Sequence, residues 1–122
     1  MQVGVALFEI HIGHSQSLKE KRMVVKSLRD KIRGRFEISA AEVGLQELHQ
    51  RARLAVCFVA LDGSAANKML SNIRSFVEGH SEASLTGWTE EMLDFDEEAP
   101  LGIPGVSWDP GVVIDEEDTT DQ

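Results

Sequence analysis

The chain has 122 residues, of which 42% are hydrophobic and 27% are charged, as is typical of a single globular domain with a modest core. A single cysteine excludes an internal disulfide, and no run of about 18 apolar residues is present that could span a membrane. We expect a cytoplasmic location, because the N-terminal residues do not combine a basic region, an apolar stretch and a cleavage site.

The formal net charge of −9 is unevenly distributed along the chain. Residues 94–122 contain ten acidic residues and no Lys or Arg, so the other 93 residues carry 12 basic and 11 acidic groups, a net charge of +1. Within that part, residues 14–53 hold ten basic and five acidic groups. The sequence therefore predicts a near-neutral domain that has a basic region and an acidic tail.

The first half of the chain predicts a strand, a helix and a second strand. Residues 1–12 alternate between two faces with a period of two, which is typical of a strand. Ser17 precedes an apolar pattern of helical spacing and stands three residues before Glu20, which predicts a capped helix over 18–34 that ends at Gly34. Residues 36–44 alternate weakly and predict another strand.

The second half repeats the pattern. Residues 48–61 predict a strand, 64–78 a helix capped by Asp62 or Ser64, and 83–93 a strand that Gly87 weakens. The order β-α-β-β-α-β predicts a ferredoxin-like α+β domain over residues 1–93, with a four-stranded antiparallel sheet and two helices on one face. Residues 94–122 are acidic and contain Pro and Gly, and we expect an extended or disordered tail there.

The predicted first helix carries a row of cations. At 100° per residue, five basic side chains fall within a sector of about 80° beside the apolar stripe: Lys19, Arg22, Lys26, Arg29 and Arg33. Such a row is able to neutralise RNA phosphates, but long basic side chains also line ordinary solvated helices. Lys21 lies within the apolar sector, and we expect it to reach solvent from the first turn. Arg51 and Arg53 either extend the basic surface over the sheet or protect a strand end.

The sheet face away from the helices is predicted to be apolar. It presents Val5, Leu7, Ala55, Cys57 and Val59. A sheet of this fold that stacks RNA bases needs aromatic side chains at such positions, and none of these residues is aromatic. We therefore expect a homodimer through this open face rather than base stacking. A lone cysteine in an apolar run is usually a small buried hydrophobe, so Cys57 is not expected to be a catalytic thiol.

Metal and catalytic motifs are weak. Glu9, His11 and His14, together with His49 or His80, match no familiar ligand spacing. Glu90 and Glu91 point to opposite faces of a strand, which argues against shared acid–base chemistry. We expect no metal, no cofactor and no catalytic residue.

The stretches "SLKEKRMVVKSLRDKIRGRF", "EISAAEVG" and "RARLAVCFVAL" resemble the YlxP-like family of bacterial proteins of uncharacterised function, over roughly residues 1–93. The positions that match its motif are Ser17, Leu18, Lys19, Lys21, Arg22, Phe36, Ser39 and Glu42. Many relatives have Asn where this chain has Glu37. The resemblance implies a small ferredoxin-like protein whose genes commonly lie among translation and ribosome-maturation genes.

Two functional hypotheses follow. The first is a non-enzymatic RNA- or ribosome-associated factor that binds nucleic acid through Lys19, Lys21, Arg22, Lys26, Arg29, Arg33, Arg51 and Arg53. In this hypothesis the acidic tail competes with RNA by contacting the basic helix within the same molecule. The alternative is a homodimeric protein-interaction module that binds no nucleic acid.

Overall fold

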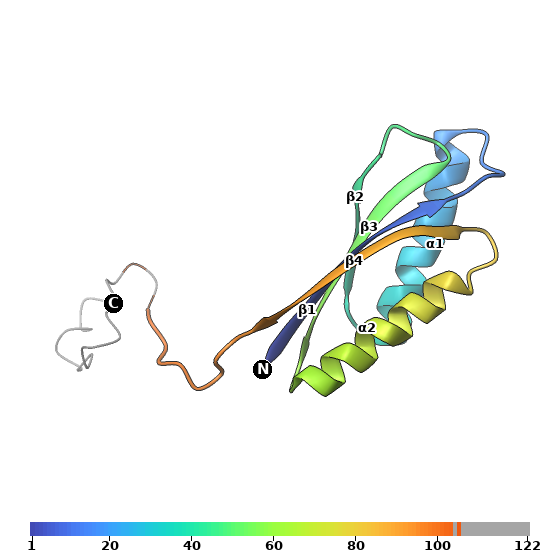
Figure 1. Cartoon of the computed structure of the whole chain (residues 1–122). Coiled ribbons are helices and arrows are strands. Elements are labelled where there is room, and N and C mark those ends of the chain that lie inside the picture. Colours follow the sequence, from blue (N-terminus) through green and yellow to red (C-terminus); the bar gives the residue numbers. More distant parts are fainter. Residues whose placement is uncertain (104, 106–122) are drawn as a thin grey trace.

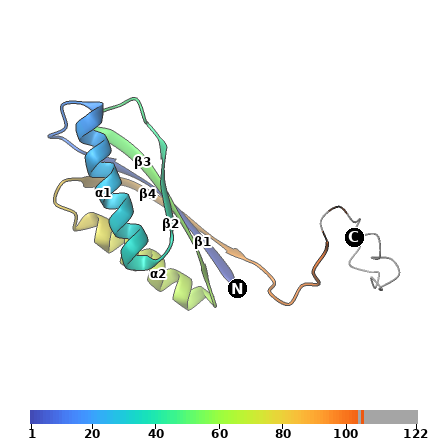
Figure 2. The ribbon, with the colours of Figure 1, turned by 180° about the vertical axis from the view of Figure 1, so that it is seen from behind.

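A computed structural model describes residues 1–103 and 105 of the chain. The elements are β1 (Gln2–His11), α1 (Leu18–Phe36), β2 (Ser39–Gly44), β3 (Arg51–Ala60), α2 (Gly63–Glu78) and β4 (Ser84–Asp94). The four strands form one antiparallel sheet in the order β2-β3-β1-β4. Both helices cover the same face of the sheet (Figure 1), and Figure 2 shows these two layers from behind. The predicted ferredoxin-like α+β fold is confirmed.

The core lies between the helices and one face of the sheet. On β1, residues at even positions from Gly4 to Ile10 are buried, and on β3 the buried positions run from Ala52 to Phe58. The helices contribute apolar side chains at helical spacing: Val24, Val25, Leu28 and Ile32 from α1, and Ala66, Leu70, Ile73 and Val77 from α2. The alternating strand pattern therefore assigns the two faces correctly.

The first helix continues past the predicted end at Gly34. It ends at Phe36, and Glu37 adopts the left-handed conformation with φ 54° while its N–H bonds the carbonyl of Arg33. The two additional residues bring the Phe36 ring edge-on to Phe76 of α2, with ring centroids 5.7 Å apart. Packing between the helices therefore sets this boundary, although a glycine three residues earlier suits a helix end better.

The predicted strands over 36–44 and 48–61 begin too early. Leu48 lies in a turn, where its N–H bonds the carbonyl of Leu45, and Leu45 has a φ of 60°. Residues 45–50 therefore form the connection between β2 and β3.

The cap of α2 agrees with one of the two predicted residues. Asp62 caps this helix by accepting a hydrogen bond from the N–H of Ala65 at 2.9 Å.

β4 is an edge strand that pairs with β1, the first strand of the chain. It pairs with β1 from Gln2 opposite Asp94 to His11 opposite Ser84, with a register shift where Gly87 lies opposite Glu9. Trp88 stacks on Phe8 across this pair, with ring centroids 5.5 Å apart. The segment beyond β4 leads away from both helices (Figure 1). Most of the predicted tail over 94–122 lies outside the described residues.

Candidate nucleic-acid interface

The row of cations on α1 faces away from the core. Ser17 caps this helix by accepting a hydrogen bond from the N–H of Glu20 at 3.2 Å, and the Glu20 carboxylate accepts one from the N–H of Gln16 at 2.8 Å. The cap fixes where the helix begins and so fixes the direction of every later side chain. Four of the five predicted cations are exposed and Arg29 is half-buried, so the row is presented to solvent: Lys19, Arg22, Lys26, Arg29 and Arg33.

Few acidic groups neutralise this row. Arg29 pairs with the adjacent Asp30, with 3.3 Å between nitrogen and oxygen. Within residues 1–103 and 105, no ion pair within 4.0 Å involves the other four side chains of the row, Lys19, Arg22, Lys26 and Arg33. Most of the positive potential of α1 is therefore available to an external anion.

Lys21 does not belong to this surface, and the prediction that it reaches solvent is wrong. Its side chain is 1% exposed, and its ammonium donates a hydrogen bond to the carbonyl of Leu45 at 2.6 Å. The same ammonium lies 3.1 Å from Oε2 of Glu42. Glu42 is on the helix-facing side of β2, while the left-handed Leu45 presents its carbonyl beside it. Lys21 is therefore a buried clamp between α1 and the β2–β3 connection.

Two features of the sequence indicate the Lys21–Glu42 pair, although the sequence alone led us to predict an exposed Lys21. Lys21 stands at an apolar angle of the helix, and Glu42 has the same parity along β2 as the buried Ala40. Lys21 and Glu42 belong to two of the three stretches that carry the resemblance to YlxP-like proteins. The fold brings these two residues together as a charge pair.

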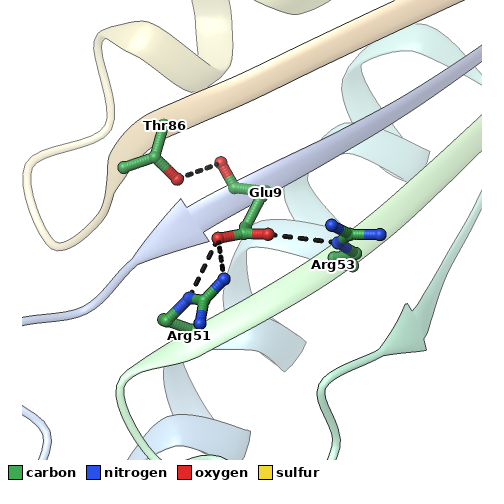
Figure 3. Close-up of polar contacts among 4 residues, drawn as sticks. All are labelled: Glu9, Arg51, Arg53 and Thr86. Carbon is green, nitrogen blue, oxygen red and sulfur yellow. Dashed lines mark hydrogen bonds and ion pairs between the residues drawn. The ribbon is translucent and has the colours of Figure 1, made fainter.

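Arg51 and Arg53 do not continue the α1 row, because they lie on the opposite face of the sheet. Arg51 donates two hydrogen bonds to Oε2 of Glu9, at 3.0 and 2.8 Å, and Arg53 donates one to Oε1 at 3.1 Å (Figure 3). The hydrogen bonds from Arg51, and then those from Arg53, hold the pKa of Glu9 below its ordinary value. We therefore leave both arginines, with Lys21, out of the candidate surface.

The remaining candidate groups are dispersed. Within the described part of the chain, no group of three or more His, Cys, Asp and Glu side chains is placed to hold a metal ion. Cys57 is exposed on the open sheet face, so the expectation of a buried thiol is wrong. Its backbone position explains this, because Cys57 alternates with the buried Val56 and Phe58.

Acidic groups gather at the opposite edge of the sheet from α1. Residues 84–98, which include β4, contain six acidic residues and no Lys or Arg. α1 packs beside β2, whereas β4 is the other edge strand and lies under α2. The described domain is therefore polarised, with a basic helix on one side and an acidic strand on the other. Sequence alone could not place these charges, because their separation depends on the strand order.

The sequence model of a family described as a protein of unknown function, DUF503, matches residues 3–89. This chain belongs to the DUF503 family. The uncharacterised protein YlxP of Bacillus subtilis is 30% identical to it over 84 residues, which are 69% of this chain and 91% of that protein. The resemblance to YlxP-like proteins is thus confirmed, and the family match runs from β1 into β4. No helix in the described part of this DUF503 protein has the length and apolar character needed to cross a membrane.

Proposed function

We propose that this protein is a non-enzymatic RNA- or ribosome-associated factor that contacts phosphates through the exposed row of α1. The observation that carries the proposal is the row itself, in which Lys19, Arg22, Lys26 and Arg33 have no ion-pair partner among the described residues. Each phosphate that a cation neutralises releases condensed counterions, so affinity is expected to fall steeply as salt rises. Arg29 contributes less, because Asp30 shares its charge.

The position of the acidic groups supports the same proposal. Acidic residues close to the row would repel RNA, but the acidic strand β4 is at the far edge of the sheet. The approach of a polyanion to α1 is therefore favoured, while its approach to the β4 edge is opposed. This polarity orients the domain on a phosphate surface.

Co-sedimentation with ribosomal subunits and with bare structured RNA, across a series of salt concentrations, tests the proposal. The decisive variant is the double charge reversal Arg22→Glu with Lys26→Glu. A matched control is Lys31→Glu with Lys68→Glu, which changes the net charge equally but leaves the row intact; Lys31 and Lys68 are both exposed. We expect binding to be lost in the first variant and largely kept in the second.

The salt series gives a second readout. For a duplex, each lost phosphate contact lowers the slope of log affinity against log salt by about 0.9, so weaker residual binding of the first variant should show a slope reduced by about 2. Equal binding by both variants, or binding that does not depend on salt, contradicts the proposal. Binding to ribosomes but not to bare RNA would identify a ribosomal surface as the partner.

A further inference from the structure

The face of the sheet that the helices leave open has an apolar centre. β1 and β3 are its two middle strands, and their cross-strand neighbours on this face form three apolar rows: Val3 with Val59, Val5 with Cys57, and Leu7 with Ala55. Val59 is 65% exposed, and Leu93 on the neighbouring β4 is 56% exposed. A contiguous apolar face of this kind is typical of an interaction surface.

On the two middle strands, charge is confined to one end of this face, while the edge strand β4 presents Glu91 opposite Val5. The row that follows Leu7 and Ala55 pairs Glu9 on β1 with Arg53 on β3. Arg51 adds a second guanidinium to Glu9, and the hydroxyl of Thr86 donates to the Glu9 carbonyl at 3.2 Å (Figure 3). An acidic group on one middle strand therefore lies beside basic groups on the other.

We propose that a second copy of this chain covers the open face, related by a two-fold axis that runs parallel to the strands between β1 and β3. This axis places β1 of each copy over β3 of the other. The apolar rows then meet one another, and Glu9 of each copy faces Arg53 of its partner. A two-fold axis across the strands would instead bring the charged end of one copy over the apolar end of the other, and would bury the ion pairs of Glu9 with Arg51 and Arg53 against apolar side chains. The charge pattern thus favours one arrangement of two identical copies.

The size of the face is sufficient for a dimer. The strands have 10, 6, 10 and 11 residues, and at about 3.3 Å per residue and about 4.8 Å between strands they give a face of about 600 Å². Two such faces in contact remove about 1,200 Å² from water, which is the lower bound for stable protein interfaces.

The relief of the face fits the same arrangement. A hollow of about 260 Å³ lies beside Gly87, between β1 and β4, and Leu7, Glu9 and Thr89 are among the residues that line it. The proposed axis places β2 of the partner over β4, and the exposed Val43 lies at the irregularity of β2 between Glu42 and Gly44, next to the row of Arg53. A branched apolar side chain from one copy would therefore approach the hollow of the other.

Sedimentation equilibrium of the full chain, from micromolar to millimolar concentration, tests the proposal directly. We expect the mass to rise to twice the chain mass of 13.5 kDa. Leu7→Lys should give a monomer throughout this range. Leu61→Lys is the matched control, because Leu61 is 90% exposed and lies beyond the end of β3, and it should dimerise as the wild type does.

A mixing experiment tests the axis. Glu9→Arg makes the charged end wholly positive, and Arg51→Glu with Arg53→Glu makes it wholly negative, so each variant alone should be monomeric. Their equimolar mixture should form a one-to-one dimer, because opposite charged ends then face each other. Circular dichroism confirms that each variant is folded before mixing.

Three results would overturn the proposal. The first is a wild-type chain that stays monomeric at millimolar concentration. The second is a folded Leu7→Lys variant that dimerises as well as the wild type, and the third is a mixture that stays monomeric. Cys57 labelling by a maleimide tests another occupant of the face. If Cys57 is shielded in a wild-type monomer and becomes reactive after truncation at Ile103, the chain's own C-terminal segment covers the face. None of these results affects RNA binding by α1, which lies on the other side of the sheet.

Discussion

The ammonium of Lys21 lies 3.1 Å from Oε2 of Glu42 and joins the first turn of α1 to β2. Lys21 is almost completely buried, and its hydrogen bond to the Leu45 carbonyl also holds the start of the β2–β3 connection. A cation that looked available to solvent in the sequence is therefore part of the framework that positions the basic row.

Replacing Lys21 by Met should destabilise the domain by about 2 kcal/mol, because the Glu42 carboxylate loses its ion-pair partner and the Leu45 carbonyl loses its hydrogen-bond donor in a partly buried site. Denaturation in urea measures the change. Lys21→Met with Glu42→Leu should recover much of the loss, since no unpaired charge then remains. RNA binding by folded Lys21→Met should equal that of the wild type. A selective loss of RNA binding without a loss of stability would instead make Lys21 a phosphate contact.

The end of α1 gives a paired prediction on stability. Gly34 lies inside the helix and a methyl group there would meet open space, so Gly34→Ala should stabilise the domain by about 0.5–1 kcal/mol. Glu37→Gly should also stabilise it, by about 1 kcal/mol, because Glu37 occupies a left-handed conformation that suits glycine. Thermal unfolding measures both effects. If Gly34→Ala destabilised the domain, the helix would instead end where the sequence pattern predicts.

Gly4 is a contrasting case in the core. A methyl group at this position would overlap the ring of Phe58, which is buried beneath the helices. Gly4→Ala should therefore destabilise the domain by about 1–3 kcal/mol, although alanine suits a strand better than glycine does. Chemical denaturation of both variants measures the change in the free energy of unfolding. This change should be negative for Gly4→Ala and positive for Gly34→Ala, although the substitution is the same. A stabilising effect of Gly4→Ala would contradict the packing of β1 on β3.

Stability should depend on pH through Glu9. Its pKa is lowered in the folded protein by Arg51 and Arg53, from an ordinary value of 4.5. The contribution of Glu9 to stability is therefore fully present above pH 4.5 and is lost as pH falls through the lower folded pKa. Unfolding free energy measured against pH should fall less steeply in that acidic window for Glu9→Gln. Identical pH profiles for the two proteins would show that the arginines do not hold the carboxylate in solution.

Truncation after Ile103 tests whether the acidic segment competes with RNA. Residues 106–122 contain six acidic residues and no basic one. As a tethered polyanion they would compete for the α1 row at high effective concentration, so their removal should strengthen RNA binding. A full-length variant with these six acids changed to Asn and Gln controls for chain length. Unchanged affinity in both proteins would remove the competition hypothesis.

Local patterns were sufficient to predict the elements, whereas the pairing of side chains was not available from them. The alternation in β1 identifies its buried face because the strand period is regular, and Asp62 is a cap by its chemistry and position. The ion pair between Glu9 and Arg53 depends on the register of β1 against β3. A local sequence pattern does not contain that register. The row of five cations on α1 was predicted from helical spacing. The burial of Lys21 was not, because it depends on Glu42 and Leu45, which the fold places beside the first turn of α1.

The pairing of β1 with β4 has a consequence for how the chain reaches its fold. β1 holds a middle position in the sheet from the beginning of the sequence, yet one of its edges pairs only with residues 84–94. Contacts of such high sequence separation close late and slow the folding of small domains. A nascent or truncated chain that lacks β4 presents an open β1 edge, a template for pairing with other chains. β4 therefore covers an edge of β1 that a chain without residues 84–94 would leave unpaired.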